Sequence, residues 1–269
     1  MAELRIGISG CAGRMGRMLI AEVAMTPGCK LSGGVDAPGS RELGKDIGEL
    51  AGIGAVGLTA GSDVAALLAA SDVVIEFSIP EATLAHVALA AQARKPLVIG
   101  TTGLDDKAHQ VLVAAGKSAP LLWAPNMSLG VNWLLALVEQ TAQRLGDDYD
   151  IEILEMHHRH KVDAPSGTAL ALGKAAAEGR KIDLAGKSQR TRDGITGARK
   201  SGDIGFATLR GGDNAGEHRV IFAADGEMIE LAHRATSRRV FARGAVAAAQ
   251  FLAPQKPGLY SMKDVLGLN

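Results

Sequence analysis

The sequence predicts an α/β protein of two domains, the first built on a parallel β-sheet and the second of the α+β class. Short apolar strands alternate with helices in the first half of the chain, which is typical of a parallel sheet covered on both faces. This alternation stops near Asn126. Three closely spaced strands come later, over 204–209, 218–223 and 228–235, and they indicate a mixed, largely antiparallel sheet with helices on one side.

Apolar runs and their flanking residues define the elements of the first half. Ser62-Asp63 is expected to cap a short helix, and Pro80 stands in the first turn of another, where its missing N–H costs nothing. The predicted strands cover 4–9, 30–35, 72–77, 96–100 and 120–124, and the predicted helices cover 14–25, 64–69, 80–93 and 105–117.

The second half is predicted in the same way. Ser128 is expected to cap a long helix, residues 180–203 are polar and are expected to form a long loop, and Asp225-Gly226 is a hairpin signal. An alanine-rich helix near the C-terminus is expected to return to the first domain. The remaining elements are helices over 131–145, 168–178 and 241–251 and a strand over 151–157.

Composition argues against several classes of partner. Lys+Arg and Asp+Glu both total 29, so the net charge is zero and no basic excess points to nucleic acid or an anionic membrane. An aromatic content of 3% leaves few platforms for base stacking. No apolar run approaches the roughly 18 residues of a membrane span.

The two cysteines indicate the compartment. Cys11 and Cys29 have no metal-ligand spacing and do not make a disulfide framework, which favours a reducing, cytoplasmic environment. The N-terminal residues run straight into a strand, so no signal peptide is expected.

A glycine-rich loop, Gly10-x-x-Gly13-x-x-Gly16, joins the first strand to the first helix. Glycines allow the backbone to turn tightly and to approach a pyrophosphate, whose charge a helix N-terminus stabilises. The loop therefore predicts a Rossmann-like dinucleotide site. The alternative is a glycine-rich turn that packs the helix closely on the strand.

Asp36 ends the second strand, 20 residues after Gly16, where a carboxylate can accept hydrogen bonds from the adenosine ribose. It is equally compatible with a plain turn. Residues 37–39, Ala-Pro-Gly, supply no cation for a 2′-phosphate; Arg14 is the nearest obvious one, and Arg41 is a weaker candidate.

Two small polar loops, 100–103 and 124–127, follow the fourth and fifth predicted strands. Ligands of open α/β sheets bind beyond the carboxyl ends of the strands, so these loops are expected to hold the nicotinamide and its ribose. Taken singly, each is as compatible with an ordinary loop.

The segment His157-His158-Arg159-His160-Lys161 is the strongest local signal. It precedes Ser166-Gly167-Thr168, which opens a helix, and a cationic loop before a helix N-terminus is suited to an anion with more than one carboxylate. With the nucleotide loop, it indicates a redox cofactor acting on a small acidic substrate. A solvated basic loop is the simpler alternative. A metal site is disfavoured, because three histidines so close on one strand end could not easily converge and no cysteine supports them.

Other residues of these types are expected to be structural. Arg159 and His160 are expected to stabilise the loop through Glu155 or Asp163. The tryptophans are expected to anchor the core, and the remaining histidines to be structural or solvent-facing: Trp123, Trp133, His86, His109, His218 and His233.

Nearly end to end, the chain resembles the 4-hydroxy-tetrahydrodipicolinate reductase family, long called dihydrodipicolinate reductases. The longest matching motif, at 155–170, is highly specific to this family. The matching segments are GCAGRMG at 10–16, FSIPEAT at 77–83, VIGTTG at 98–103, APNMSLGVN at 124–132, EMHHRHKVDAPSGTAL at 155–170, IGFATLRGGDNAGEH at 204–218 and DVLGL at 264–268.

The resemblance implies NAD(P)H-dependent reduction of a small cyclic dicarboxylate on the diaminopimelate route to lysine, by a homotetramer assembled through the C-terminal sheets. It implies a dinucleotide-binding domain over 1–128 and 238–269, and a substrate-binding and tetramerisation domain over 129–237. It also assigns roles. His157 matches the proton donor/acceptor, Lys161 the catalytic proton donor, and His158, Gly167 and Thr168 the substrate-carboxylate ligands. The implied cofactor contacts are Gly10, Cys11, Ala12, Gly13, Arg14, Met15, Gly16, Asp36, Gly100, Thr101, Thr102, Ala124, Pro125, Asn126 and Met127.

Two departures from the family pattern bear on the cofactor. Many members carry arginine where this chain has Ala37, and some carry a basic residue where it has Ile79. Both losses weaken a preference for NADPH, so we expect NADH to be used at least as well.

Two other classes of function stay open on the sequence. One is a nicotinamide-linked dehydrogenase of an aspartate-derived aldehyde, which would need a catalytic thiol. The other is a non-catalytic NAD-binding sensor. In the reductase, Lys161 is expected to donate the proton that accompanies the hydride, and His157 is expected to titrate near neutrality.

Overall fold

The computed structural model describes residues 3–268, and these form two compact units. Within that range, the residues up to Leu129 and those from Arg239 make the first unit, and Gly130–Arg238 make the second. Each boundary falls one residue later than the sequence-based domains place it. The functions assigned to the two domains stay predictions at this point.

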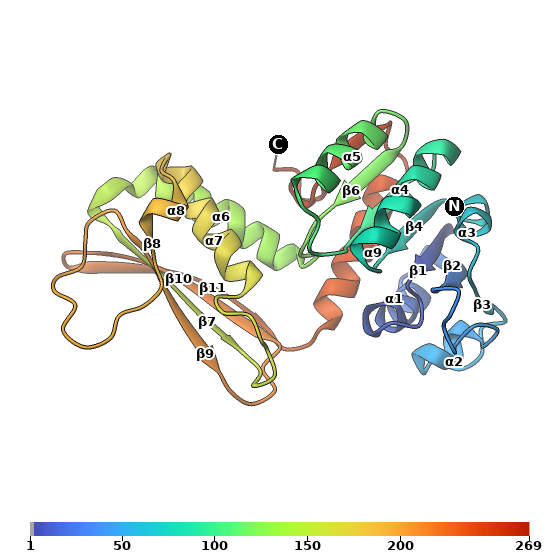
Figure 1. Ribbon diagram of the computed structural model, residues 1–269, viewed down its shortest axis with the longest axis horizontal. Coiled ribbons are helices and arrows are strands. Elements are labelled where there is room, and N and C mark those ends of the chain that lie inside the picture. Colours follow the sequence, from blue (N-terminus) through green and yellow to red (C-terminus); the bar gives the residue numbers. More distant parts are fainter. Residues whose placement is uncertain (1–2, 269) are drawn as a thin grey trace. The chain divides into compact units, whose positions relative to one another are not determined.

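The first unit is built on a seven-stranded sheet whose strand pairs are all parallel (Figure 1). The strand order is β12-β6-β5-β4-β1-β2-β3, so the chain starts near the middle and winds outward in both directions. This confirms the predicted Rossmann-like fold. The strands are β1 (Leu4–Ser9), β2 (Cys29–Val35), β3 (Ala60–Gly61), β4 (Val73–Glu76), β5 (Leu97–Ile99), β6 (Pro120–Trp123) and β12 (Gly258–Tyr260).

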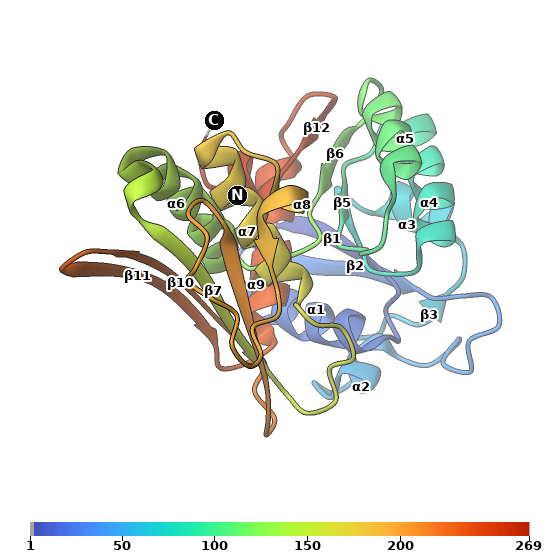
Figure 2. The same cartoon turned by 60° about the vertical axis from the view of Figure 1, so that its left-hand side comes forward.

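Helices cover both faces of this sheet, as Figure 2 shows from a second direction. One group, α3 (Val64–Ala70), α4 (Pro80–Ala93) and α5 (Asp106–Gly116), packs on the face with Val74 and Leu121. The other group packs on the face with Ile8 and Val98: α1 (Arg14–Met25), α2 (Ile47–Ala51), α9 (Arg239–Leu252) and α10 (Met262–Val265). Across residues 3–268, no helix combines the length and apolar character needed to span a bilayer.

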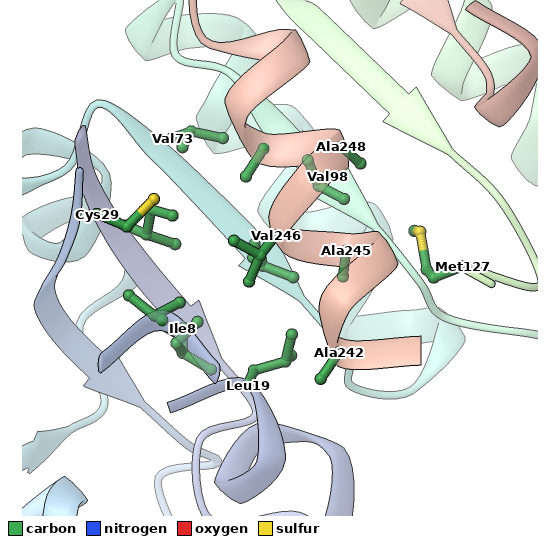
Figure 3. Packing of buried hydrophobic residues seen from close by; sticks show 14 of the residues in the cluster. Ile8, Leu19, Cys29, Val73, Val98, Met127, Ala242, Ala245, Val246 and Ala248 are labelled. Atoms are coloured by element: carbon green, nitrogen blue, oxygen red, sulfur yellow. The ribbon is translucent and has the colours of Figure 1, made fainter. Parts of the chain in front are cut away.

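The C-terminal segment completes the first unit. Helix α9 lies against α1 and strands β4, β5 and β6, and Figure 3 shows Ala242, Ala245 and Val246 among the buried side chains there. Small residues let the helix approach closely: a β-carbon on Gly244 would lie 1.7 Å from the Met127 carbonyl oxygen. The prediction that this helix returns to the first domain is confirmed.

The second unit contains a mixed sheet, as predicted, but its pairs are parallel as often as antiparallel; it has five strands in the order β11-β10-β7-β9-β8. Strand β10 pairs antiparallel with β7 and β11, whereas β9 pairs parallel with β7 and β8. The parallel pair arises because a helix separates β7 from β9. The strands are β7 (Asp150–His157), β8 (Ser188–Gln189), β9 (Ile204–Arg210), β10 (Gly216–Ala224) and β11 (Glu227–Ala235).

Two helices, α6 (Leu129–Leu145) and α7 (Gly167–Arg180), cover one face of the mixed sheet (Figure 1). A short 3-10 turn, η1 (Gly146–Asp148), links α6 to β7. Burial alternates along β7, so Glu155 and His157 lie on the helix-covered face with Ile151 and Ile153. An acid and an imidazole are thereby placed at the end of an otherwise apolar core.

Two sequence-based expectations are wrong in the second unit. Residues 180–203 are not one loop, because they include helix α8 (Leu184–Lys187), capped by the Asp183 side chain, and strand β8. Elements of four and two residues are too short to give a periodic signal. Trp133 is not a core anchor either, since it is 46% exposed on α6.

Candidate active site

The glycine-rich loop connects β1 to α1 and serves packing as well as access. A β-carbon on Gly10 (φ +77°) would lie 2.2 Å from the Phe77 carbonyl oxygen, and one on Gly16 would lie 2.1 Å from the Gly10 oxygen. At Gly10 and Gly16, glycine is therefore required for the helix and the loop to pack closely, which is the alternative interpretation of the glycine-rich turn. Gly13 differs, because it is exposed and begins α1 without a side-chain cap. No side chain within residues 3–268 caps the first N–H groups of α1, which is compatible with the predicted contact to a pyrophosphate.

Asp36, at the end of β2, holds the glycine-rich loop in place through hydrogen bonds. Its carboxylate accepts hydrogen bonds from the backbone N–H groups of Ala12, at 2.8 Å, and Ala37, at 2.7 Å. The side chain is therefore fixed beside the glycines and is more than a turn residue. Its contact with a ribose stays a prediction.

A cavity of about 850 Å³ opens at the carboxyl ends of β1, β2 and β4. Its lining includes Gly10, Gly13, Asp36, Ala37, Ile79 and His86. The place and size match those of a dinucleotide site in an open α/β sheet. His86, which was expected to be structural or solvent-facing, lies beside this cavity with its Nδ1 3.4 Å from Ser9 Oγ and 3.6 Å from Glu76 Oε1, contacts that agree with a structural role.

Glu76, at the end of β4, is fully buried and organises the neighbouring loops. It accepts hydrogen bonds from Thr83 Oγ1 (3.0 Å), Thr101 Oγ1 (2.9 Å) and Ser78 Oγ. Thr101 Oγ1 in turn accepts from the Ser78 N–H, at 3.2 Å. The loops after β4 and β5 are thus joined through one carboxylate. Glu76 was not among the predicted site residues, although an acid inside the apolar run DVVIEF is a visible signal.

The two polar loops, 100–103 and 124–127, contact their surroundings through backbone as well as through the side chains of Thr101 and Asn126. A β-carbon on Gly100 would lie 2.1 Å from the Phe77 ring, and the Trp123 indole donates to the Thr101 carbonyl oxygen at 3.2 Å. Thr102 and Pro125 are exposed, whereas Ala124 and Met127 are buried in the core.

Cys11, another predicted cofactor contact, also points into the core, where burial raises the pKa of its thiol to about 11. For Cys11, Ala124 and Met127, any contact with a cofactor must therefore come from the backbone.

His157, at the end of β7, is held in the second unit by a buried acid. Its Nδ1 lies 2.6 Å from Glu155 Oε2, and its ring meets His218 edge to face at 5.1 Å. Burial lowers the pKa of His157, the nearby charges of Lys161 and Arg210 lower it further, and Glu155 opposes this only in part. The pKa of His157 therefore lies below its ordinary value, and the neutral ring predominates at pH 7.

Lys161 lies in the loop after β7 with its Nζ 2.7 Å from Asp163 Oδ1. This ion pair holds the pKa of Asp163 below its ordinary value. The expected contacts of Arg159 and His160 with the two acids are wrong, because Glu155 pairs with Arg210 and Asp163 pairs with Lys161.

The proposed carboxylate ligands lie around the start of α7 and the end of β7. Ser166 Oγ caps α7 by accepting from the Ala169 N–H at 3.1 Å, and Gly167 is exposed with open space around it. Thr168 follows within the same first turn. His158 Nε2 lies 3.3 Å from an Arg238 nitrogen, and its buried Nδ1 has no hydrogen-bond partner within residues 3–268.

Three residues near His157 were missed. Arg210 forms an ion pair with Glu155. His218 is buried, and burial lowers the pKa of its imidazole to about 4. A β-carbon on Gly216 would lie 2.9 Å from His157 Nε2. All three fall within the matching segment 204–218, in which Arg210 and Gly216 had no expected role and His218 was expected to be structural or solvent-facing. Across the described range, no three His, Cys, Asp or Glu side chains are grouped as metal ligands would be.

A doubly wound parallel sheet with a glycine-rich first loop, joined to a unit that carries a buried histidine–glutamate pair and a lysine, defines a Rossmann-type oxidoreductase of two domains. The more specific assignment comes from comparison with protein families. The model described as dihydrodipicolinate reductase, N-terminus, matches residues 4–127, and that described as dihydrodipicolinate reductase, C-terminus, matches residues 130–266. The chain belongs to the dihydrodipicolinate reductase family, which confirms the resemblance.

Relatives of known name agree along their full lengths. A 4-hydroxy-tetrahydrodipicolinate reductase of Rhodopseudomonas palustris (strain HaA2) is 54% identical over 268 residues, covering 100% of this chain and 99% of the relative. That of Parvibaculum lavamentivorans is also 54% identical and covers 99% of both chains.

Solved structures share the fold. A dipicolinate-bound dihydrodipicolinate reductase from Paenisporosarcina sp. TG-14 has a TM-score of 0.79 at 22% identity, covering 97% of this chain and 99% of its own. GenD2 from gentamicin A biosynthesis, in complex with NAD, has a TM-score of 0.60 at 13% identity, covering 100% and 91%.

The hydrogen bonds to the buried Glu76 carboxylate predict the effect of substituting Thr83. Replacing Thr83 with valine keeps the shape but removes a donor to the buried carboxylate, so we expect Thr83→Val to lower the free energy of unfolding by about 1–3 kcal/mol. We also expect weaker NADH binding, because Glu76, which joins the loops after β4 and β5, loses one of its donors. Thermal unfolding and NADH fluorescence titration measure the two effects.

Thr83→Ser is the matched control, since it keeps the hydroxyl and loses one methyl group. Equal NADH affinity in the valine and serine variants would contradict the anchoring role of Thr83.

Proposed function

We propose that this protein catalyses the NAD(P)H-dependent reduction of 4-hydroxy-tetrahydrodipicolinate, through dihydrodipicolinate, to tetrahydrodipicolinate in the diaminopimelate route to lysine. Membership of the reductase family supports this reaction. The observation that carries it at the site is the meeting, in one unit, of His157, Lys161 and the open N-terminus of α7.

The substrate is a ring with two carboxylates, and the second unit offers suitable groups for both. Backbone N–H groups at Gly167 and Thr168 begin α7, whose dipole favours an anion. His158 adds an imidazole beside Arg238. The dipicolinate bound by the Paenisporosarcina reductase is a dicarboxylate of this kind, which supports the proposed class of ligand.

The bound nicotinamide cofactor supplies a hydride, and the residues of this chain manage the proton. Lys161 donates a proton to the substrate as negative charge develops on the ring. Asp163, 2.7 Å from the lysine nitrogen, holds the ammonium group in the loop until substrate binds. His157 is neutral at pH 7, so it acts as an acceptor or relay for the proton and is not its first source.

Cofactor choice is proposed from the rim of the first-unit cavity. Asp36 lies where the adenosine ribose hydroxyls are expected, and the adjacent cavity residues Ala37 and Ile79 carry no charge. Arg17 donates to the Ala12 carbonyl oxygen and lies 3.6 Å from Glu42, so its charge is already engaged. These features favour NADH at least as much as NADPH.

The aldehyde-dehydrogenase alternative has no support in the site. Cys11 and Cys29 are both buried, and burial raises the pKa of each thiol, which makes a thiolate nucleophile unfavourable.

Assembly and location are the last parts of the proposal. The face of the mixed sheet opposite α6 and α7 carries Leu154, Met156, Ile221 and Met228 among paired charges such as Arg219 and Glu230, and this mixed surface is suited to association with a second sheet. We propose that the chain forms a homotetramer through this surface. We also propose a cytoplasmic location, which two free cysteines favour and which recovery in another cell fraction would contradict.

The proposed proton donor can be tested directly. Lys161→Ala is expected to lower kcat by about 10²- to 10⁴-fold, because the proton then has no positioned donor, while NADH affinity stays unchanged. Steady-state assays with the product of dihydrodipicolinate synthase and fluorescence titration give the two quantities.

Lys174→Ala is the control. Lys174 is an exposed lysine on α7 that lies beyond the first turn of the helix, and its Nζ is 3.9 Å from Glu178 Oε1. Wild-type kcat in the Lys161 variant would contradict the assignment, and a wild-type protein without turnover would favour the NAD-binding sensor.

The cofactor proposal predicts a gain of function. Ala37→Arg places a guanidinium beside Asp36, so we expect the ratio of kcat/KM for NADPH to that for NADH to rise about 10-fold. Ala37→Gln, long but uncharged, is expected to leave the ratio unchanged. A wild-type enzyme that uses NADPH alone would overturn the proposal.

The tetramer proposal predicts that a charge on the free sheet face prevents assembly. Ile221 lies opposite Glu152 on β7 and Glu230 on β11, so Ile221→Asp adds a third carboxylate and is expected to give smaller species in light scattering. Val113→Asp, at a 46% exposed position on α5, should leave the mass unchanged. A wild-type monomer would contradict the proposal.

A further inference from the structure

Glu155 is a buried acid that has no part in the proton transfer described above. It lies on β7, two residues before His157, and is 1% exposed on the helix-covered face of the sheet. A carboxylate in such surroundings is costly unless donors surround it. The identity of those donors therefore shows what the residue organises.

Donors from two other segments, together with His157 on the same strand, converge on the Glu155 carboxylate. Arg210, on β9, forms a two-pronged ion pair with NH1 at 2.8 Å from Oε2 and NH2 at 2.9 Å from Oε1. His157 Nδ1 lies 2.6 Å from Oε2, and the Ser166 backbone N–H donates to Oε1 at 3.0 Å. The two oxygens thus link the catalytic imidazole to the residue that caps α7.

We propose that Glu155 is a positioning residue of the reductase reaction, which fixes the ring of His157 and the N-terminus of α7 in one arrangement. The inference rests on the proposed roles of His157, Gly167 and Thr168. It adds that a single carboxylate sets the geometry of the proton relay and of the carboxylate-binding helix end together.

The contact also selects a tautomer. A carboxylate only accepts hydrogen bonds, so Nδ1 of His157 must carry the hydrogen, and Nε2 of the neutral ring holds a lone pair. Nε2 faces Gly216, where a β-carbon would lie 2.9 Å away. The absence of a side chain at Gly216 keeps this nitrogen accessible.

His218 supports the same arrangement from β10. Ser166 Oγ accepts from the Ala169 N–H and also shares a hydrogen bond with His218 Nε2, 3.1 Å away. His218 in turn packs edge to face on His157. The cap of α7 is therefore fixed to His157 by two routes, through Glu155 and through His218.

The charges around His157 give the proposal a readout that a purely structural role would not share. The groups that face it are Glu155 on β7, Lys161 in the following loop, Arg210 on β9 and His218 on β10. Burial and the two cations lower the pKa of His157, whereas Glu155 raises it. Removing the charge of Glu155 must therefore lower this pKa further.

The test is the pH dependence of kcat/KM in matched variants. Activity is lost as pH falls and His157 takes up a proton, so Glu155→Gln is expected to move this acid limb to lower pH. At neutral pH the same variant is expected to lose about 10- to 100-fold in kcat/KM, because the ring and the helix end are no longer fixed.

Glu152→Gln is the control. Glu152 lies on the same strand but the opposite face, where Arg192 and Arg199 bind it, so the variant removes an equally well-paired carboxylate. It is expected to keep the wild-type limb and rate. His157→Gln identifies the limb, which should disappear in that variant.

The outcomes separate this inference from the role of His157. An unchanged limb in Glu155→Gln, with the limb lost in His157→Gln, would overturn the positioning role, even if thermal stability falls. A wild-type limb in His157→Gln would overturn the role of His157 and this inference with it. If Glu155→Gln does not fold, Glu155→Asp provides a second test. This variant keeps the charge but shortens the side chain by one methylene, so it should still lower kcat/KM. Wild-type kinetics in Glu155→Asp would also overturn the proposal.

Discussion

Both units depend on the same constraint, which is that a buried acid must be surrounded by donors. Glu76 and Glu155 lie at or near the carboxyl ends of central strands, β4 and β7, and both are almost completely buried. Each is stabilised only if specific groups from other segments reach it. The loops that bear Thr101 in one unit and Ser166 in the other are therefore held where the strands end, which is where ligands of such sheets bind.

Much of the fold could be predicted from the sequence because its signals are local. The glycine loop, the apolar runs of β1 and β4 and the proline at the start of α4 each depend on a few neighbouring residues. Elements such as β3 and β8, with two residues each, give no such signal and form only because a longer strand is beside them. The exposure of Trp133 was unpredictable for a related reason, since the composition of a helix does not fix which of its apolar residues face the core.

The site divides in the same way. His157, Lys161 and Gly167 lie within one short segment, so their proximity is visible in the sequence. Arg210 reaches Glu155 across 55 positions, and His218 reaches Ser166 across 52. Those pairings depend on the register of β9 and β10 against β7, which no local pattern encodes. The lowered pKa of His157 comes first from its burial and then from the charges of Lys161 and Arg210, and neither the burial nor the approach of Arg210 could be judged from the local sequence.

The return of α9 and β12 to the first unit has a consequence for how the chain folds during synthesis. Until residues 239–260 leave the ribosome, Ile8, Val73 and Val98 lack the helix that covers them, and β6 remains an open edge. The second unit, by contrast, is continuous in sequence and can close as soon as Arg238 has emerged. The nascent chain thus carries an uncovered apolar sheet through the synthesis of an entire intervening unit, a stage at which chaperone binding or misassembly would compete with folding.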